Sequence, residues 1–134
     1  MNVTQNVPLQ SYNSFGIVAK AYSLVRIGTV EEAVEAQKAL QNHPEGHCVL
    51  GGGSNIVLTG DVRPLVLKME IMGKHLVSET DKAWIVEAGA GENWHEVVAW
   101  TIQNDWPGLE NLALIPGCSG AAPVQNIGAY GVEL

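Results

Sequence analysis

The pattern of apolar positions in the first half of the chain predicts short strands around one helix. Apolar and β-branched residues at 21–27 indicate a strand. Thr29 and Glu32 have the spacing of a capping box, so we expect a helix to begin there and to end near His43 and Pro44. Three further apolar runs are predicted as strands, at residues 47–50, 56–58 and 65–69. The first half should therefore form a small α/β layer in the order β-α-β-β-β.

The second half is predicted to contain a hairpin and a second helix. Residues 75–78 and 83–88 flank a polar turn, as the two strands of a hairpin do. A helix is expected from about residue 92 to 103, with an inward stripe made of Trp94, Val97, Val98, Thr101 and Ile102. From residue 111 onward the chain is apolar and rich in glycine, and its last four residues have the pattern of a strand that is only beginning. We therefore expect these residues to be a fragment of a longer chain.

Composition indicates a globular domain and argues against several classes of function. The 134 residues are 46% hydrophobic and 16% charged, which is too apolar for a disordered chain. The formal net charge is −7 and the basic residues are scattered, so nucleic-acid binding, which needs a basic face, is not expected. There is neither a signal peptide nor an apolar run of about 20 residues, so no membrane span is expected.

The cysteines and histidines give no indication of catalysis or metal binding. Cys48 and Cys118 lie far apart in a chain without secretion signals, so we expect two reduced and mostly buried thiols. One pair of histidines, His43 and His47, has helical i,i+4 spacing, but Pro44 between them prevents a helix. The other two histidines are isolated in sequence, so we predict no metal site.

Glycine is the unusual component of this sequence. Fifteen of the 134 residues are glycine, above the average of roughly 7%, and they are clustered. Residues 51–55, Gly-Gly-Gly-Ser-Asn, stand between two predicted strands, and we call them the glycine loop. Consecutive glycines can direct successive backbone N–H groups to one point, which suits a phosphate or diphosphate. The pattern is neither a P-loop nor a dinucleotide-binding turn, and a flexible hairpin turn is the alternative interpretation.

Two further glycine-rich segments allow different interpretations. Residues 89–94 follow a strand and precede a helix, as a dinucleotide fingerprint does, but Trp94 replaces its third glycine and Glu92 adds a negative charge. We therefore predict a tight turn and a helix start there. Residues 116–131 form either a buried crossing or a wall for a flat, neutral heteroaromatic ligand, with polar groups from Ser119, Gln125 and Asn126.

Three stretches together resemble the UDP-N-acetylenolpyruvoylglucosamine reductases, also called UDP-N-acetylmuramate dehydrogenases. They are Asn-Ser-Phe-Gly at 13–16, Leu-Gly-Gly-Gly-Ser-Asn at 50–55, and the long run from 89 to 131 that ends in Gln-Asn-Ile-Gly-Ala-Tyr-Gly. The resemblance implies an α+β, two-lobed FAD-binding domain of the vanillyl-alcohol-oxidase (PCMH) type, truncated at its C-terminus. Residues 1–70 would form the first α/β lobe and residues 71–134 an incomplete second α+β lobe, with the substrate-binding domain absent.

The resemblance also implies that FAD binds between the two halves. We expect the cofactor to be held without a covalent bond to the protein. The diphosphate would lie on Gly51, Gly52, Gly53, Ser54 and Asn55. The rest of the cofactor would be lined by Ile115, Pro116, Gly117, Ser119, Gly120, Ala121, Gln125, Asn126, Ile127 and Gly128. Tyr130 would lie near the flavin or the substrate.

The activity that the resemblance implies is a reduction of a UDP-sugar. NADPH would be the hydride donor, and UDP-N-acetylglucosamine enolpyruvate would become UDP-N-acetylmuramate, a cytoplasmic precursor of peptidoglycan. The arginine, serine and glutamate of the family's catalytic motifs fall beyond residue 134, so no catalytic residue is expected in this chain. Two alternatives are another FAD oxidoreductase of the same fold and a flavin-binding module without catalysis.

Overall fold

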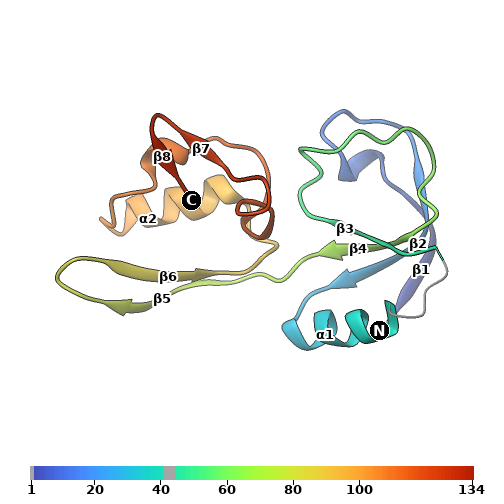
Figure 1. The fold of residues 1–134 in the computed structure, drawn as a ribbon, viewed down its shortest axis with the longest axis horizontal. Helices are drawn as coiled ribbons and strands as arrows, with labels where there is room; N and C mark the ends of the chain where they lie inside the picture. Colours follow the sequence, from blue (N-terminus) through green and yellow to red (C-terminus); the bar gives the residue numbers. More distant parts are fainter. Residues whose placement is uncertain (1, 41–44) are drawn as a thin grey trace. The chain divides into compact units, whose positions relative to one another are not determined.

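The computed structural model describes residues 2–40 and 45–134, which form two compact units (Figure 1). Unit 1 is Met1–Ile71 and unit 2 is Met72–Leu134. Each unit has its own hydrophobic core. The architecture of both units combines helices with β-sheet.

Unit 1 is built on a four-stranded mixed sheet in the order β1-β2-β4-β3. Strand β1 pairs antiparallel with β2, whereas β2, β4 and β3 run parallel. The bounds of its elements are β1 Val3–Pro8, the 3₁₀ helix η1 Gln10–Tyr12, β2 Lys20–Ile27, α1 Val30–Leu40, β3 His47–Leu50 and β4 Leu65–Met69. The strands predicted at 21–27, 47–50 and 65–69 are therefore confirmed.

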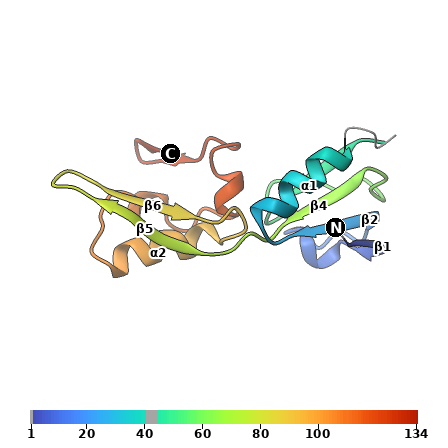
Figure 2. The same cartoon turned by 90° about the horizontal axis from the view of Figure 1, so that it is seen from below.

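The two faces of this sheet are buried against different parts of the chain. Helix α1 lies along one face (Figure 2), where Ala36 packs with strand residues that alternate along β2 and β4: Val25, Ile27, Leu65 and Leu67. The opposite face is covered by the turn around η1 and by the connection between β3 and β4. Its core consists of Leu9, Ala21, Leu24, Leu50 and Val66. The alternation of β-strand side chains thus assigns each residue of β4 to one of two environments.

Helix α1 begins at the capping box that the sequence predicts. The Thr29 hydroxyl accepts a hydrogen bond from the Glu32 backbone N–H at 3.2 Å, and the Glu32 carboxylate accepts one from the Gly28 N–H at 2.7 Å. The pKa of Glu31 is lowered from its ordinary value, first by a hydrogen bond from its own backbone N–H and then by one from the Thr29 hydroxyl. The predicted end of this helix, near His43 and Pro44, lies outside the described residues.

The strand prediction for unit 1 is wrong at residues 56–58 and omits β1. Residues 56–58 are not a strand: they pair with none of the strands of the sheet, and Ile56 and Leu58 pack on the core instead. Strand β1 was not predicted, because its sequence is polar and most of its residues are exposed. It forms by antiparallel pairing with β2, a non-local interaction that leaves no apolar pattern in the sequence.

Unit 2 contains the predicted hairpin, the second helix and a glycine-rich tail. Its elements are β5 Lys74–Glu79, β6 Trp84–Ala88, α2 Trp94–Gln103, the 3₁₀ helices η2 Glu110–Leu112 and η3 Ser119–Ala121, β7 Gly128–Ala129 and β8 Val132–Glu133. The core packs α2 against the tail through Trp94, Val98, Leu112, Ala122 and Ile127. The indole N–H of Trp94 donates to the Leu112 carbonyl at 2.9 Å. The one polar atom of the buried Trp94 side chain therefore has a hydrogen-bond partner inside this core.

The inward stripe predicted for α2 is correct except at Ile102. Four of its five members are buried, but Ile102 is 49% exposed. Ile102 lies in the last turn of α2, where the chain leaves the helix through Trp106 and Pro107, and it lines an open depression there. The helix also begins at Trp94 rather than at 92, because Asn93 is its N-cap.

Candidate functional site

The glycine loop follows β3 at the edge of the sheet where the parallel strands β2, β4 and β3 end. This carboxyl edge is where open sheets with parallel strands bind ligands. The loop is held by its carbonyls: Gly51 accepts from the Lys68 ammonium at 2.9 Å, and Gly53 accepts from the Ser14 N–H at 3.0 Å. Among residues 2–40 and 45–134, none accepts a hydrogen bond from the backbone N–H groups of residues 51–55. Five consecutive donors therefore have no protein acceptor among the described residues, as expected of a loop that binds an anion.

Gly53 is the position in this loop that cannot carry a side chain. Its φ is +69°, in the left-handed region, and it is buried. A Cβ atom on Gly53 would lie 1.9 Å from the Tyr12 carbonyl oxygen, far inside any real contact. Gly52, by contrast, is exposed and is not among the residues with positive φ. The alternative of a flexible turn does not account for this close packing.

The turn that presses on Gly53 is held by a buried asparagine. Asn13 is 7% exposed, and its amide N–H groups donate to the carbonyls of Leu9 at 2.8 Å and Ile17 at 3.1 Å. Its side-chain oxygen accepts from the Ile17 N–H at 2.9 Å. These three hydrogen bonds satisfy the buried amide and fix the backbone of residues 12–14, which contacts the glycine loop. The start of the Asn-Ser-Phe-Gly stretch thus packs directly against the glycine loop and is hydrogen-bonded to it.

Lys68 stands beside the glycine loop, through its bond to Gly51, and Arg26 lies next to it in the sheet; neither basic residue was predicted from the sequence. Arg26 on β2 and Lys68 on β4 are register neighbours. Arg26 is bonded to the Glu70 carboxylate and to the Tyr12 hydroxyl. The signal that could have identified Lys68 is a single charged residue inside an otherwise apolar strand, Leu-Val-Leu-Lys-Met.

In unit 2, residues 117–120 lie along the tight turn that precedes α2. The Gly120 N–H donates to the Ala90 carbonyl at 3.0 Å, and the Trp94 N–H donates to the Gly117 carbonyl at 3.1 Å. A Cβ atom on Gly120 would lie 2.6 Å from the Cβ of Ala90, so this glycine is required by close backbone packing. The prediction of a tight turn and a helix start at residues 89–94 is confirmed.

Glu92 in that turn is engaged within unit 2. It is 8% exposed, and its carboxylate accepts from the Gly73 N–H at 2.7 Å. The Lys74 ammonium lies 3.5 Å from the other carboxylate oxygen, so the buried charge is paired. Glu92 therefore connects the turn before α2 to Gly73 and Lys74 at the start of unit 2.

The rest of the tail is largely accessible. Ala122 and Ile127 are buried, but the side chains of Gln125 and Asn126 are exposed. Tyr130, between β7 and β8, is 89% exposed and has a φ of +54°. Unit 2 therefore does not contain a wholly buried crossing. Of the polar residues singled out in the sequence, Gln125 and Asn126 lie at its surface, whereas Ser119 is half-buried and its hydroxyl donates to the Glu92 carbonyl at 3.3 Å.

The two cysteines have different environments, and both are free thiols. Cys118 is buried as predicted, whereas Cys48 is exposed, which corrects the prediction of two mostly buried thiols. The reason is that Cys48 lies on β3, an edge strand whose first three residues are all exposed. Within the described parts of the chain, no group of three His, Cys, Asp or Glu side chains could hold a metal ion.

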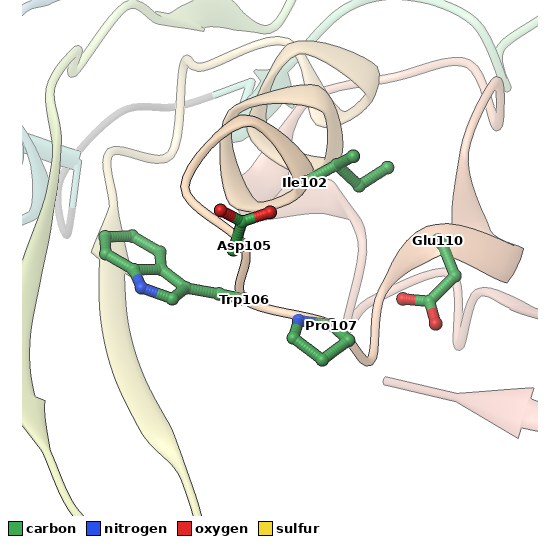
Figure 3. A pocket seen from close by; sticks show the side chains of 5 residues that line it. All are labelled: Ile102, Asp105, Trp106, Pro107 and Glu110. Atoms are coloured by element: carbon green, nitrogen blue, oxygen red, sulfur yellow. The ribbon is translucent and has the colours of Figure 1, made fainter.

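An open depression lies at the C-terminal end of α2, away from the glycine loop in sequence. It is lined by Ile102, Asp105, Trp106, Pro107 and Glu110 (Figure 3). The Glu110 carboxylate accepts a hydrogen bond from the Gly108 N–H at 2.6 Å, which is the main reason that its pKa is lowered. Trp106 packs edge-on against Trp100, with ring centroids 5.1 Å apart. The depression is therefore formed by the turn that follows α2, whose residues are held by these local contacts.

No helix in the described residues has the length and apolar character needed to cross a membrane.

Comparisons with known proteins place this architecture in a family. The family described as an FAD binding domain matches residues 22–134. The UDP-N-acetylenolpyruvoylglucosamine reductase of Dechloromonas aromatica (strain RCB) is 52% identical over 134 residues, which are 100% of this chain and 39% of that protein. The protein of the same name from Burkholderia orbicola (strain MC0-3) is 56% identical over 129 residues, 95% of this chain and 36% of that protein. The chain thus spans 36 to 39% of the length of these relatives.

A solved structure agrees with the sequence comparisons. The crystal structure of UDP-N-acetylenolpyruvylglucosamine reductase from Thermus caldophilus has a TM-score of 0.71 and 28% sequence identity to this chain, and the match covers 99% of this chain and 45% of that one. The resemblance to these reductases and the α+β FAD-binding fold are therefore confirmed. Because the family match extends over residues 22–134, well beyond half of the chain, the chain belongs to the FAD binding domain family.

Proposed function

We propose that this chain is the FAD-binding part of a UDP-N-acetylenolpyruvoylglucosamine reductase. Relatives with that name share 52 to 56% of its residues, and family membership makes FAD the cofactor. The observation that carries the proposal is the row of free N–H donors in the glycine loop, at the carboxyl edge of parallel strands. Such a row matches the oxygen atoms of a diphosphate, the most strongly charged part of FAD.

The residues present fit this cofactor. Gly51, Gly52, Gly53, Ser54 and Asn55 would bind the diphosphate, with the positive charge of Lys68 behind them. In unit 2, residues 115–128 would line the rest of the cofactor, through small side chains and the exposed amides of Gln125 and Asn126. Neither segment contains a charged residue, which suits the neutral, flat ring of a flavin. Tyr130 is accessible for contact with the flavin or the substrate.

The proposed reaction reduces UDP-N-acetylglucosamine enolpyruvate to UDP-N-acetylmuramate in the cytoplasm, as a step of peptidoglycan precursor synthesis. When bound, FAD supplies the capacity to accept hydride from NADPH and to deliver it to the enolpyruvyl double bond. The contribution of this chain is to bind and orient the cofactor: the glycine loop holds the diphosphate, and the tail positions the ring. We assign no proton transfer to residues 1–134, and we propose that units 1 and 2 are the two lobes of the FAD-binding domain.

A substitution at Gly52 in the complete protein tests the proposal. Gly52 is exposed and lacks a positive φ, so Gly52→Val should fold while its branched side chain blocks the neighbouring N–H groups. Losing two hydrogen bonds to a charged group, each worth about 1.5–3 kcal/mol, should weaken FAD binding about 100-fold or more. The matched control is Gly60→Val, because Gly60 is also exposed and a Cβ there meets nothing within 4 Å.

The measurement is the dissociation constant of FAD, followed by flavin absorbance and fluorescence. Acid precipitation should release all the yellow colour into the supernatant, because the Cys118 side chain is buried and no histidine lies in either predicted FAD-binding segment. An unchanged affinity in folded Gly52→Val would refute the diphosphate assignment. Colour that stays in the protein pellet would refute non-covalent binding.

A further inference from the structure

Lys68 occupies a position in the fold that core packing does not explain. It lies on β4, a central strand of the unit 1 sheet, two residues after Val66 and on the same face as that buried residue. Its neighbours in register are Arg26 on β2 and Leu50 on β3, the last residue before the glycine loop. Placing an ammonium group there costs side-chain entropy and desolvation, whereas an apolar residue would extend the core.

The partners of the Lys68 ammonium are backbone carbonyls. It donates to the Gly51 carbonyl at 2.9 Å and to the Met69 carbonyl at 3.3 Å. Among the described residues, no carboxylate lies within ion-pair distance of Lys68. The ammonium therefore forms no ion pair with any described side chain, and it contacts the first residue of a loop with five N–H donors that have no described protein acceptor.

The hydrogen bond to Gly51 determines where the next N–H points. In a trans peptide the C=O and the following N–H lie in one plane and point in opposite directions. Because the Gly51 carbonyl faces Lys68, the Gly52 N–H faces away from it. The Gly53 carbonyl is held in the same manner by the Ser14 N–H, so the Ser54 N–H faces away from the Asn13 turn.

We propose that Lys68 is a positioning residue for the diphosphate of FAD. Its hydrogen bond to the Gly51 carbonyl directs the Gly52 N–H away from β4, and its positive charge, which forms no ion pair with a described side chain, adds attraction for the two phosphates. This inference rests on the proposed function, since it concerns the same loop. The inference goes beyond the proposed function because it assigns the orientation of the glycine loop to a side chain outside that loop, on the neighbouring strand β4.

The test compares Lys68→Met, Lys68→Arg and Lys38→Met in the complete protein. Methionine keeps the length of the side chain but removes the donor and the charge, and Lys38 on α1 is an exposed lysine that controls for the loss of one charge. We measure the dissociation constants of FAD and of riboflavin, which has the flavin ring but no phosphate, and the thermal midpoint of each cofactor-free variant.

Lys68→Met should weaken FAD binding about tenfold to a hundredfold, the effect of losing hydrogen bonds and attraction at a charged group. Its affinity for riboflavin and its thermal midpoint should stay close to those of Lys38→Met. Lys68→Arg should recover most of the affinity for FAD, because it keeps the charge and the donors.

Two results would overturn the inference while leaving the proposed function intact. One is an FAD affinity of Lys68→Met equal to that of Lys38→Met, in a protein that binds FAD normally. The other is an equal loss of affinity for FAD and riboflavin, which would show a general structural role. If the unsubstituted protein fails to bind FAD, the proposed function itself is wrong, and the inference falls with it.

Discussion

At the scale of single residues, the glycines of this chain differ in how strongly the structure requires them. Gly53 combines a left-handed backbone with a backbone contact that excludes any side chain. Gly16 also has a positive φ, of +62°, but a Cβ on it would meet nothing within 4 Å. Gly60 has neither constraint. The three positions therefore separate the cost of backbone strain from the cost of a steric clash.

We predict that Gly53→Ala destabilises unit 1 by about 2–4 kcal/mol, since both costs apply. Gly16→Ala should cost about 1 kcal/mol from strain alone. Gly60→Ala should stay within about 0.5 kcal/mol of the unsubstituted protein. The measurement is hydrogen exchange of the backbone amides of β2 and β4 in the complete protein. Equal protection in Gly53→Ala and Gly60→Ala would show that the Tyr12 carbonyl does not constrain the loop.

At the scale of elements, each unit joins segments that are distant in sequence through backbone hydrogen bonds. In unit 1, the turn after η1 supports the glycine loop, through Ser14 and Gly53. In unit 2, the start of α2 is joined to residues 117–120, and the Asn93 side chain caps the helix by accepting from the Glu96 N–H at 3.2 Å. The first turn of α2 therefore supports the tail that we propose lines the cofactor.

We predict that Asn93→Ala destabilises the first turn of α2 by about 1 kcal/mol, the usual cost of losing an N-cap. Asn93→Gly should cost only about a few tenths of a kcal/mol, because glycine lets water reach the free N–H groups. Asn111→Ala is the matched control, as Asn111 is exposed and lies outside α2. Amide exchange at residues 95–98 measures the effect, and equal protection in Asn93→Ala and Asn111→Ala would contradict the role of this cap.

At the scale of the whole molecule, we expect the glycine loop and residues 115–128 to supply binding groups but no group for acid catalysis. The glycine loop and residues 115–128 contain no charged side chain. General acid catalysis typically contributes about 100- to 10,000-fold to a rate, and binding energy from the rest of a substrate orients the reacting atoms. We expect both contributions to come from residues other than these segments.

We predict that residues 1–134 alone, supplied with FAD and NADPH, reduce the enolpyruvyl substrate at least 100-fold more slowly than the complete protein. The assay follows substrate-dependent oxidation of NADPH by both proteins at equal flavin content. The content of bound FAD is measured separately, so that a loss of binding is not mistaken for a loss of catalysis. Comparable turnover by the two proteins would place the catalytic groups within these residues.

Local interactions explain which parts of the structure the sequence predicts. The capping box at Thr29 and Glu32, the hairpin of unit 2 and most of the buried stripe of α2 depend on residues a few positions apart. Their patterns are complete within a short window of sequence, so they can be recognised without a fold. The glycine loop was also recognised, because its unusual composition is local.

The sequence by itself was enough to predict the two helices, the hairpin and three strands of unit 1, the glycine loop and the resemblance to the reductases. The tertiary structure decided which apolar runs became strands, why β1 pairs despite its polar sequence, and that Cys48 is exposed. It also decided that Gly53 is the glycine of the loop with the left-handed backbone and that Lys68 reaches Gly51, 17 positions away in sequence. The physical reason is that sheet order and backbone-to-side-chain contacts join distant segments. The pattern of apolar residues within one segment does not indicate which other segment it will pair with.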